Sequence, residues 1–126
     1  MLIVDTDILI DIQRKAPGAV EWSISLPEPP SVTGFSAMEM IQGARDSREV
    51  EIALNTIAPL TVLWPSASDC ERARLLYAQA HLSHKLGLID ALIACTALGL
   101  DAELATFNVK HYRAVEGLRL VQPYAR

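Results

Sequence analysis

Apolar and polar positions along the chain follow two patterns, short apolar runs and helical spacing. Apolar runs at 2–4, 60–64, 103–106 and 118–121 are too short for helices and are rich in branched side chains, which predicts strands. A weaker strand is predicted at 32–33, because prolines come shortly before it.

Between these runs, apolar residues recur at intervals of three and four, which predicts helices. The predicted helices span 7–13, 19–25, 36–45, 48–57, 66–85 and 91–98, and 108–111 forms a loop or a short turn of helix. The helix 91–98 is apolar nearly all round, so we expect it to be buried, with Cys95 as a small core residue.

The strands alternate with the helices, and they are apolar throughout rather than on every second residue. This order predicts an α/β fold with three layers, α/β/α, around a mostly parallel sheet of four to five strands. A length of 126 residues fits one domain, 1–126, with a substantial core.

The net charge of −4 argues against nucleic-acid binding through bulk basicity. The charge leaves open a local basic rim for nucleic-acid phosphates, formed by Arg14, Lys15, Lys85, Lys110 and Arg113. No apolar run is long enough for a membrane span, and the two cysteines show no disulfide framework. We therefore expect a protein without a membrane partner, in a reducing cytoplasm.

Polar side chains follow several predicted strands or begin the next helix. Asp5 ends the first strand, Glu39 lies in the first turn of the helix after the second, Asp90 opens the buried helix, and Asn108 follows the strand 103–106. The carboxyl ends of parallel strands share one edge of a sheet, where ligands bind, so these side chains can converge.

Each of these carboxylates also has a purely structural interpretation. Ser36 and Glu39 fit a capping box, and the same pattern recurs at Ser68 and Glu71 without any evident chemistry. Asp90 could simply cap its helix. We expect Asp7 or Thr6 to cap the first helix, because Asp5 ends the strand and comes one position too early.

Taken together, the carboxylates favour a metal site. Two carboxylates within ~5 Å of each other repel by ~3 kcal/mol at an effective dielectric constant near 20, so a shared proton or a cation must lie between them. Hard oxygen ligands without a nearby set of histidine and cysteine suit Mg²⁺ or Mn²⁺. Such ions activate water for in-line attack at phosphorus.

Four motifs in order resemble the PIN-domain ribonucleases, and most closely the VapC toxins of toxin–antitoxin pairs. They are Val4-Asp5-Thr6-Asp7-Ile8-Leu9-Ile10-Asp11, Ser36-x-x-Glu39-x-x-x-Gly43, Ile89-Asp90-Ala91-Leu92-Ile93-Ala94 and Ala105-Thr106-Phe107-Asn108. The resemblance covers the whole chain. It implies a parallel sheet between helices and a homodimeric endoribonuclease that depends on Mg²⁺ or Mn²⁺, cleaves RNA and is inhibited by a cognate antitoxin.

The resemblance also implies roles for individual residues. Asp5, Glu39 and Asp90 match the acidic positions of the family and are the expected catalytic residues and metal ligands. The expected supporting residues are Thr6, Asp7, Ser36, Thr106 and Asn108. The sequence departs from the family at the fourth acidic position. Asn108 stands where many members have Asp, and His111 stands where other members have Asp.

Two other interpretations remain open. Asp5-Thr6-Asp7 after an apolar strand is also how HAD phosphatases begin, with the two carboxylates as nucleophile and acid/base. A PIN-like module that only binds a partner is the second alternative, although the intact acidic set argues against it.

The pattern also predicts a surface for assembly. Apolar side chains on two helices exceed what one small sheet needs, and we expect part of them to form a two-fold dimer interface. These side chains are Val50, Leu54, Ile57, Leu75 and Leu76.

Overall fold

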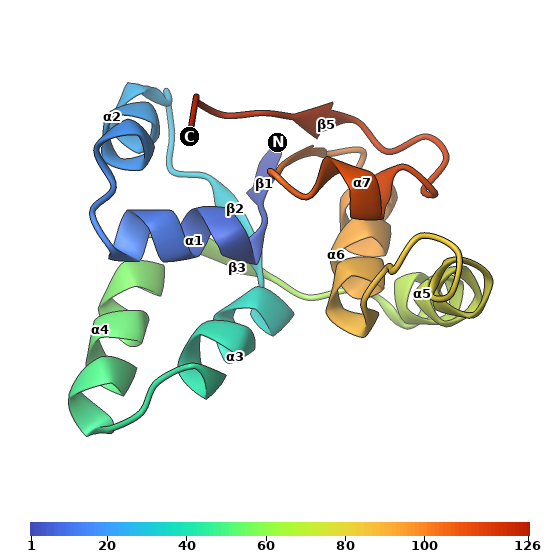
Figure 1. The fold of residues 1–126 in the computed structure, drawn as a ribbon, viewed down its shortest axis with the longest axis horizontal. Helices are drawn as coiled ribbons and strands as arrows, with labels where there is room; N and C mark the ends of the chain where they lie inside the picture. Colours follow the sequence, from blue (N-terminus) through green and yellow to red (C-terminus); the bar gives the residue numbers. More distant parts are fainter.

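The computed structural model describes residues 1–126 and shows five parallel strands between two groups of helices (Figure 1). The strand order across the sheet is β3-β2-β1-β4-β5, and every pair of neighbours is parallel. The strands are β1 (Leu2–Val4), β2 (Ser31–Thr33), β3 (Thr61–Leu63), β4 (Glu103–Ala105) and β5 (Leu120–Val121). The first strand of the sequence is therefore the centre of the sheet.

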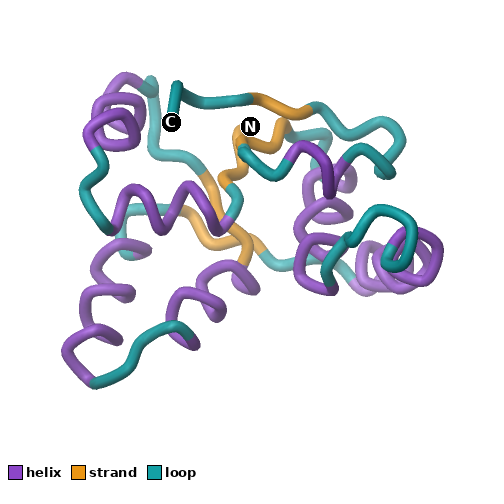
Figure 2. The backbone as a smooth tube through the Cα atoms, in the orientation of Figure 1, coloured by secondary structure: helices purple, strands orange, loops and turns teal.

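The helices form two groups that lie on opposite sides of the strands (Figures 1 and 2). The first group contains α1 (Thr6–Gln13), α2 (Pro17–Ser25), α3 (Gly34–Gln42) and α4 (Ser47–Ile57). The second group contains α5 (Ala67–Ala80), α6 (Leu88–Gly99) and the short α7 (Val109–Tyr112).

Each group of helices packs on its own hydrophobic core. Ile3 and Leu104 belong to the core under α5 and α6, whereas Val4, Val32 and Ala105 belong to the core under α1, α3 and α4. Successive residues of a strand point to opposite faces, so a strand covered on both sides is apolar at every position. The predicted α/β/α fold with a parallel sheet is confirmed.

The outer strand β3 differs from the buried strands that the sequence predicted. Thr61 and Val62 are exposed, because β3 is an edge of the sheet and has a neighbour on one side only. The helix predicted at 91–98 is buried over most of its length, and Cys95 is fully buried as expected.

The predicted helix 66–85 ends early, at Ala80. The five residues that follow Ala80 are all exposed, so no core packing supports further turns, and Lys85 has a left-handed backbone with φ of 55°. The pattern at Ser68 and Glu71 is not a capping box. The cap is formed two residues earlier, by Ser66 and Asp69, and Glu71 pairs with Arg74 instead.

The expected dimer surface is only partly exposed. Leu54 and Leu75 are about half exposed, at 51% and 52%, but Ile57 is buried in the core and is not available to a partner. None of the helices combines the length and the apolar character needed to cross a bilayer.

Candidate active site at the carboxyl edge of the sheet

Asp5 lies where the central strand β1 turns into α1. It is only 2% exposed, and its Oδ1 accepts a 2.8 Å hydrogen bond from the backbone N–H of Thr6. Asp5 is therefore the N-cap of α1, and the prediction that Asp7 or Thr6 would take that place was wrong. The strand ends at Val4 and the helix begins at Thr6, so one residue both follows the strand and caps the helix.

The neighbouring strand β4 supplies the second contact of Asp5. The backbone N–H of Asp5 donates to the carbonyl of Ala105, which brings Thr106 beside Asp5 at the end of the two strands. The Thr106 hydroxyl donates a 2.7 Å hydrogen bond to Asp5 Oδ2 and accepts one from the backbone N–H of Asn108. Both carboxylate oxygens of Asp5 are thus held in a fixed orientation.

Glu39 reaches the same edge from α3. Its Oε1 accepts a 2.7 Å hydrogen bond from the Thr6 hydroxyl. The predicted capping box with Ser36 is not formed, because α3 begins at Gly34 and its N-cap is Thr33. The buried Ser36 instead donates its backbone N–H to the Thr33 hydroxyl and helps to fix the start of α3.

Asp90 lies in the first turn of α6, two residues after the helix begins. Its Oδ2 accepts from the backbone N–H of Gly87, so Asp90 does stabilise its helix, as the structural interpretation proposed. The same carboxylate also faces α7: Oδ1 accepts from the Tyr112 hydroxyl at 3.3 Å, and Nδ1 of His111 lies 3.5 Å from Oδ2. Asp90 can therefore stabilise the start of α6 and take part in the candidate active site at the same time.

Tyr112 is the residue of this site that the sequence analysis missed. Its side chain is 1% exposed, and burial, followed by the charges of Asp5 and Asp90, raises the pKa of its hydroxyl well above the ordinary value. Tyr112 thus contacts Asp90 and lies near the charge of Asp5. No signal in the sequence pointed to it, because its place depends on how α7 packs against α6.

Two of the expected supporting residues differ in exposure. Asp7 accepts a 3.0 Å hydrogen bond from the backbone N–H of Phe107 with Oδ2, while its buried Oδ1 has no partner. Asn108 begins α7 but its side chain is exposed and forms no capping hydrogen bond. Asp7 therefore fixes the loop after β4, whereas the Asn108 amide is free to meet a ligand.

The edge concentrates negative charge around Asp5. Burial raises the pKa of the Asp5 carboxyl to about 7, the charges of Asp7 and Asp90 add to the rise, and the hydrogen bonds from Thr106 and Thr6 oppose it. Nδ1 of His111 lies 3.5 Å from Asp90 Oδ2, and the charge of Arg126 opposes the rise in the pKa of the Asp7 carboxyl. A bound cation would remove the repulsion that now favours the protonated form of Asp5.

The acidic side chains at this edge do not by themselves enclose a metal ion. No three His, Cys, Asp or Glu side chains are grouped closely enough to enclose an ion, so the expected three-carboxylate cage is not assembled. Mg²⁺, however, keeps several waters and is usually held by one or two carboxylates together with substrate phosphates. The oxygen-only donors Asp5 and Asp90, with Glu39 linked through Thr6, fit a site of that open kind.

Comparison with known proteins agrees with this geometry. The family model "PIN domain" matches residues 2–117, which is most of the chain. The chain belongs to the PIN-domain family. Ribonuclease VapC10 of Mycobacterium tuberculosis is 34% identical over 94% of this chain and 91% of its own length. Ribonuclease VapC1 of Haemophilus influenzae (strain R2866) is 32% identical over 93% of both chains.

A solved structure shows how closely the PIN fold is retained. A chain of a toxin–antitoxin complex from Klebsiella pneumoniae superposes with a TM-score of 0.80 at 26% identity, covering 100% of both chains. The HAD-phosphatase alternative is thereby set aside, because the PIN match covers the Asp5-Thr6-Asp7 segment itself. PIN-domain ribonucleases of the VapC type generally depend on a divalent metal.

Proposed function

We propose that this PIN domain, residues 1–126, is a VapC-type endoribonuclease that cleaves RNA with Mg²⁺ or Mn²⁺. The observation that carries the proposal is the Asp5 carboxylate, which is buried at the carboxyl end of the central strand near the charges of Asp7 and Asp90. The relatives that match over nearly the whole chain are named ribonucleases, which supports the same chemistry.

The residues at this edge of the sheet have two roles, to hold the metal and to orient the attacking water. Oxygens of Asp5 and Asp90 would hold the metal, and Glu39, fixed by Thr6, completes the site or orients the attacking water. When bound, the ion would polarise the phosphodiester and lower the pKa of a coordinated water. Thr106 and Tyr112 hold Asp5 and Asp90 in place, and the exposed Asn108 amide can approach the phosphate.

The charge of the surface fits an RNA substrate through local contacts rather than through bulk attraction. The five cations that the sequence singled out are all exposed. They are Arg14, Lys15, Lys85, Lys110 and Arg113. Lys110 lies in α7 beside His111 and Arg113 directly follows α7, so they can reach phosphates beside the cleaved bond.

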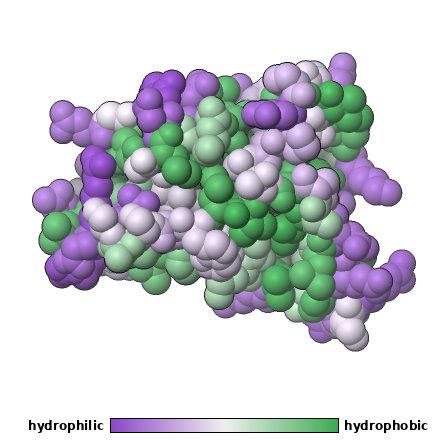
Figure 3. Space-filling model, turned by 180° about the vertical axis from the view of Figure 1, so that it is seen from behind, coloured by the Kyte–Doolittle hydropathy of each residue, from purple (hydrophilic) through white to green (hydrophobic).

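The proposal includes two protein partners. A chain like this one occurs in a toxin–antitoxin complex, which supports a cognate antitoxin that inhibits the site in the cytoplasm. A homodimer is supported by apolar side chains that gather on one face of the molecule (Figure 3), together with the exposed Leu54 and Leu75. Light scattering at micromolar concentration should give twice the 13.8 kDa mass of the chain, and a monomer mass would contradict the dimer.

Purified protein incubated with mixed-sequence RNA tests the activity. Cleavage should need Mg²⁺ or Mn²⁺ and stop on chelation, and Asp5→Ala and Asp90→Ala should abolish it while the circular dichroism spectrum is kept. Glu51→Ala, an exposed carboxylate on α4, is the matched control and should cleave like the wild type. Cleavage that survives both Asp5→Ala and chelation would overturn the proposal, and a folded protein that cleaves no RNA would favour the non-catalytic module.

A further inference from the structure

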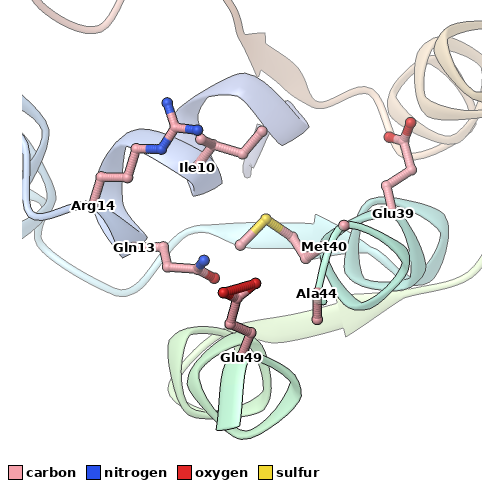
Figure 4. Close-up of a pocket in the computed structure, with 8 residues that line it drawn as sticks. Ile10, Gln13, Arg14, Glu39, Met40, Ala44 and Glu49 are labelled. Carbon is pink, nitrogen blue, oxygen red and sulfur yellow. The ribbon is translucent and has the colours of Figure 1, made fainter. Parts of the chain in front are cut away.

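A pocket that the proposed chemistry does not use lies between α1, α3 and α4. Its volume is about 160 Å³, and its lining is mixed, with polar and apolar side chains (Figure 4). Figure 4 shows the ends of Gln13 and Glu49 pointing toward one another, while the Glu39 carboxylate points away. Glu39 therefore belongs to both places, since its backbone lines the pocket wall and its carboxylate accepts from Thr6 at the site.

Gln13 is the feature that points to a ligand. Its Oε1 is buried and accepts no hydrogen bond within the protein. A buried acceptor without a partner is unfavourable, and a ligand that brings an N–H group to it removes that cost. A side-chain amide also offers two donors, so one glutamine can both accept from and donate to the same partner.

The other walls suit a flat ring carried on a phosphate chain. Ile10 and Met40 supply apolar surface, and the methionine sulfur makes favourable contacts with aromatic rings. Arg14 lies at the rim and forms no ion pair, so its guanidinium is free for a phosphate. Glu49, in contrast, is already paired with Arg45, which reduces the negative charge inside the pocket.

The position of the pocket relative to the site fits a strand of RNA. Gln13 is seven residues after Thr6 in one helix, which corresponds to roughly 10 Å along the axis. Stacked bases of a nucleic-acid strand are about 3.4 Å apart, and unstacked bases are farther apart. About three nucleotides or fewer therefore cover the distance between the site and the pocket.

We propose that this pocket receives one unstacked base of the RNA, within about three nucleotides of the cleaved bond; the proposal rests on the ribonuclease function proposed above. Gln13 pairs with the edge of the base, Ile10 and Met40 contact its ring, and Arg14 holds a neighbouring phosphate. A glutamine amide accepts from an amino group and donates to the ring nitrogen beside it. Adenine offers this arrangement on two edges, N6 with N7 and N6 with N1, and cytosine on one, so adenine is the expected base. The pocket would then determine which RNA sequence is cleaved.

The test uses RNA binding by the Asp5→Asn protein, which is expected not to cleave. Nine-residue oligouridylates with one central A, C, G or U serve as probes, and fluorescence anisotropy gives their dissociation constants without divalent metal. The adenine probe should bind about fivefold or more tightly than the all-uridine probe, the low end of what one good base contact gives. Adding Gln13→Leu should reduce that ratio to near one.

Two further variants separate base contact from phosphate contact and from general effects. Arg14→Ala should weaken all four probes by a similar factor, because a phosphate contact carries no sequence information. Gln79→Leu, an exposed glutamine on the distant α5, should change nothing. Two results would overturn the pocket proposal alone: an adenine preference that survives Gln13→Leu, or RNA binding with no base preference. A side chain of a protein partner would then be the better candidate to occupy the pocket. Absence of any RNA binding would overturn the pocket and count against the ribonuclease function together.

Discussion

The hydroxyl of Thr106 donates a 2.7 Å hydrogen bond to Asp5 Oδ2 across a separation of 101 residues. The contact exists because β1 and β4 are neighbours in the sheet and end at the same level, with Val4 opposite Ala105. It is one of the few interactions that favour the charged form of Asp5, since burial and the neighbouring carboxylates favour the neutral form.

The raised pKa of Asp5 makes the metal-free protein less stable as the pH rises. The carboxyl has a pKa of about 7 in the folded protein and an ordinary value of 3.8, so the folded state binds the proton more tightly than the unfolded state does. Stability is therefore lost between about pH 4 and pH 7, by an amount on the order of 4 kcal/mol at most. Urea unfolding in EDTA should show this fall for the wild type and a much smaller one for Asp5→Asn. Parallel pH profiles for the two proteins would contradict the assignment.

Thr106→Val should raise the pKa of Asp5 further, because it removes a hydrogen bond to the charged form while keeping the shape of the side chain. At pH 7 a larger share of Asp5 would then be protonated, so Mg²⁺ or Mn²⁺ should bind several-fold more weakly. Calorimetric titration measures the affinity, and Thr106→Ser should behave like the wild type. Equal affinity in the valine variant would show that this hydroxyl does not influence the metal site.

Thr6→Val tests whether the orientation of Glu39 matters. The variant keeps the backbone N–H that donates to Asp5 Oδ1 but loses the hydroxyl that donates to Glu39 Oε1. One hydrogen bond to a charged group contributes ~1.5 kcal/mol, so kcat should fall about tenfold. Thr6→Ser should restore the rate. An unchanged kcat in Thr6→Val would show that the orientation of Glu39 does not affect the reaction rate.

Tyr112→Phe should weaken metal binding without unfolding the protein. The ring remains in the core, but Asp90 loses the hydrogen bond from the hydroxyl. Loss of a partner that orients a ligand typically reduces metal affinity by 10–100-fold, and this contact is long at 3.3 Å, so about tenfold is expected. Calorimetry gives the affinity and thermal unfolding checks the fold. An unaltered affinity with a lowered melting temperature would show a structural role alone.

Asn108→Asp should tighten metal binding in the free protein. The exposed amide stands next to Thr106 at the site edge, and the affinity of oxygen sites rises with the number of charged ligands. Asn108→Ala should reduce activity less than Asp5→Ala does. If Asn108→Asp leaves affinity and stoichiometry unchanged, residue 108 lies too far from the ion to act as a ligand.

The caps show where local reasoning about this sequence failed. A capping box needs only the right residue types three positions apart, and three such pairs occur in the chain, at Ser36 and Glu39, Ser66 and Asp69, and Ser68 and Glu71. Which pair forms depends on where the helix starts, and that is fixed by the strand or loop before it. Glu39 consequently became available to Thr6, a residue 33 positions away.

The sequence by itself determined the order of strands and helices, the parallel sheet and the carboxylates at its edge, because apolar periodicity and strand–helix junctions are local properties of the chain. Only the tertiary structure decided that Asp5 caps α1, that Thr106 and Tyr112 orient Asp5 and Asp90, and that Gln13 faces a pocket. The cap at Asp5 depends on where β1 ends, and the other contacts depend on strand order and helix packing, which bring together residues that are far apart in the chain. The burial that raises the pKa of Asp5 comes from those same contacts, so no local pattern could reveal it.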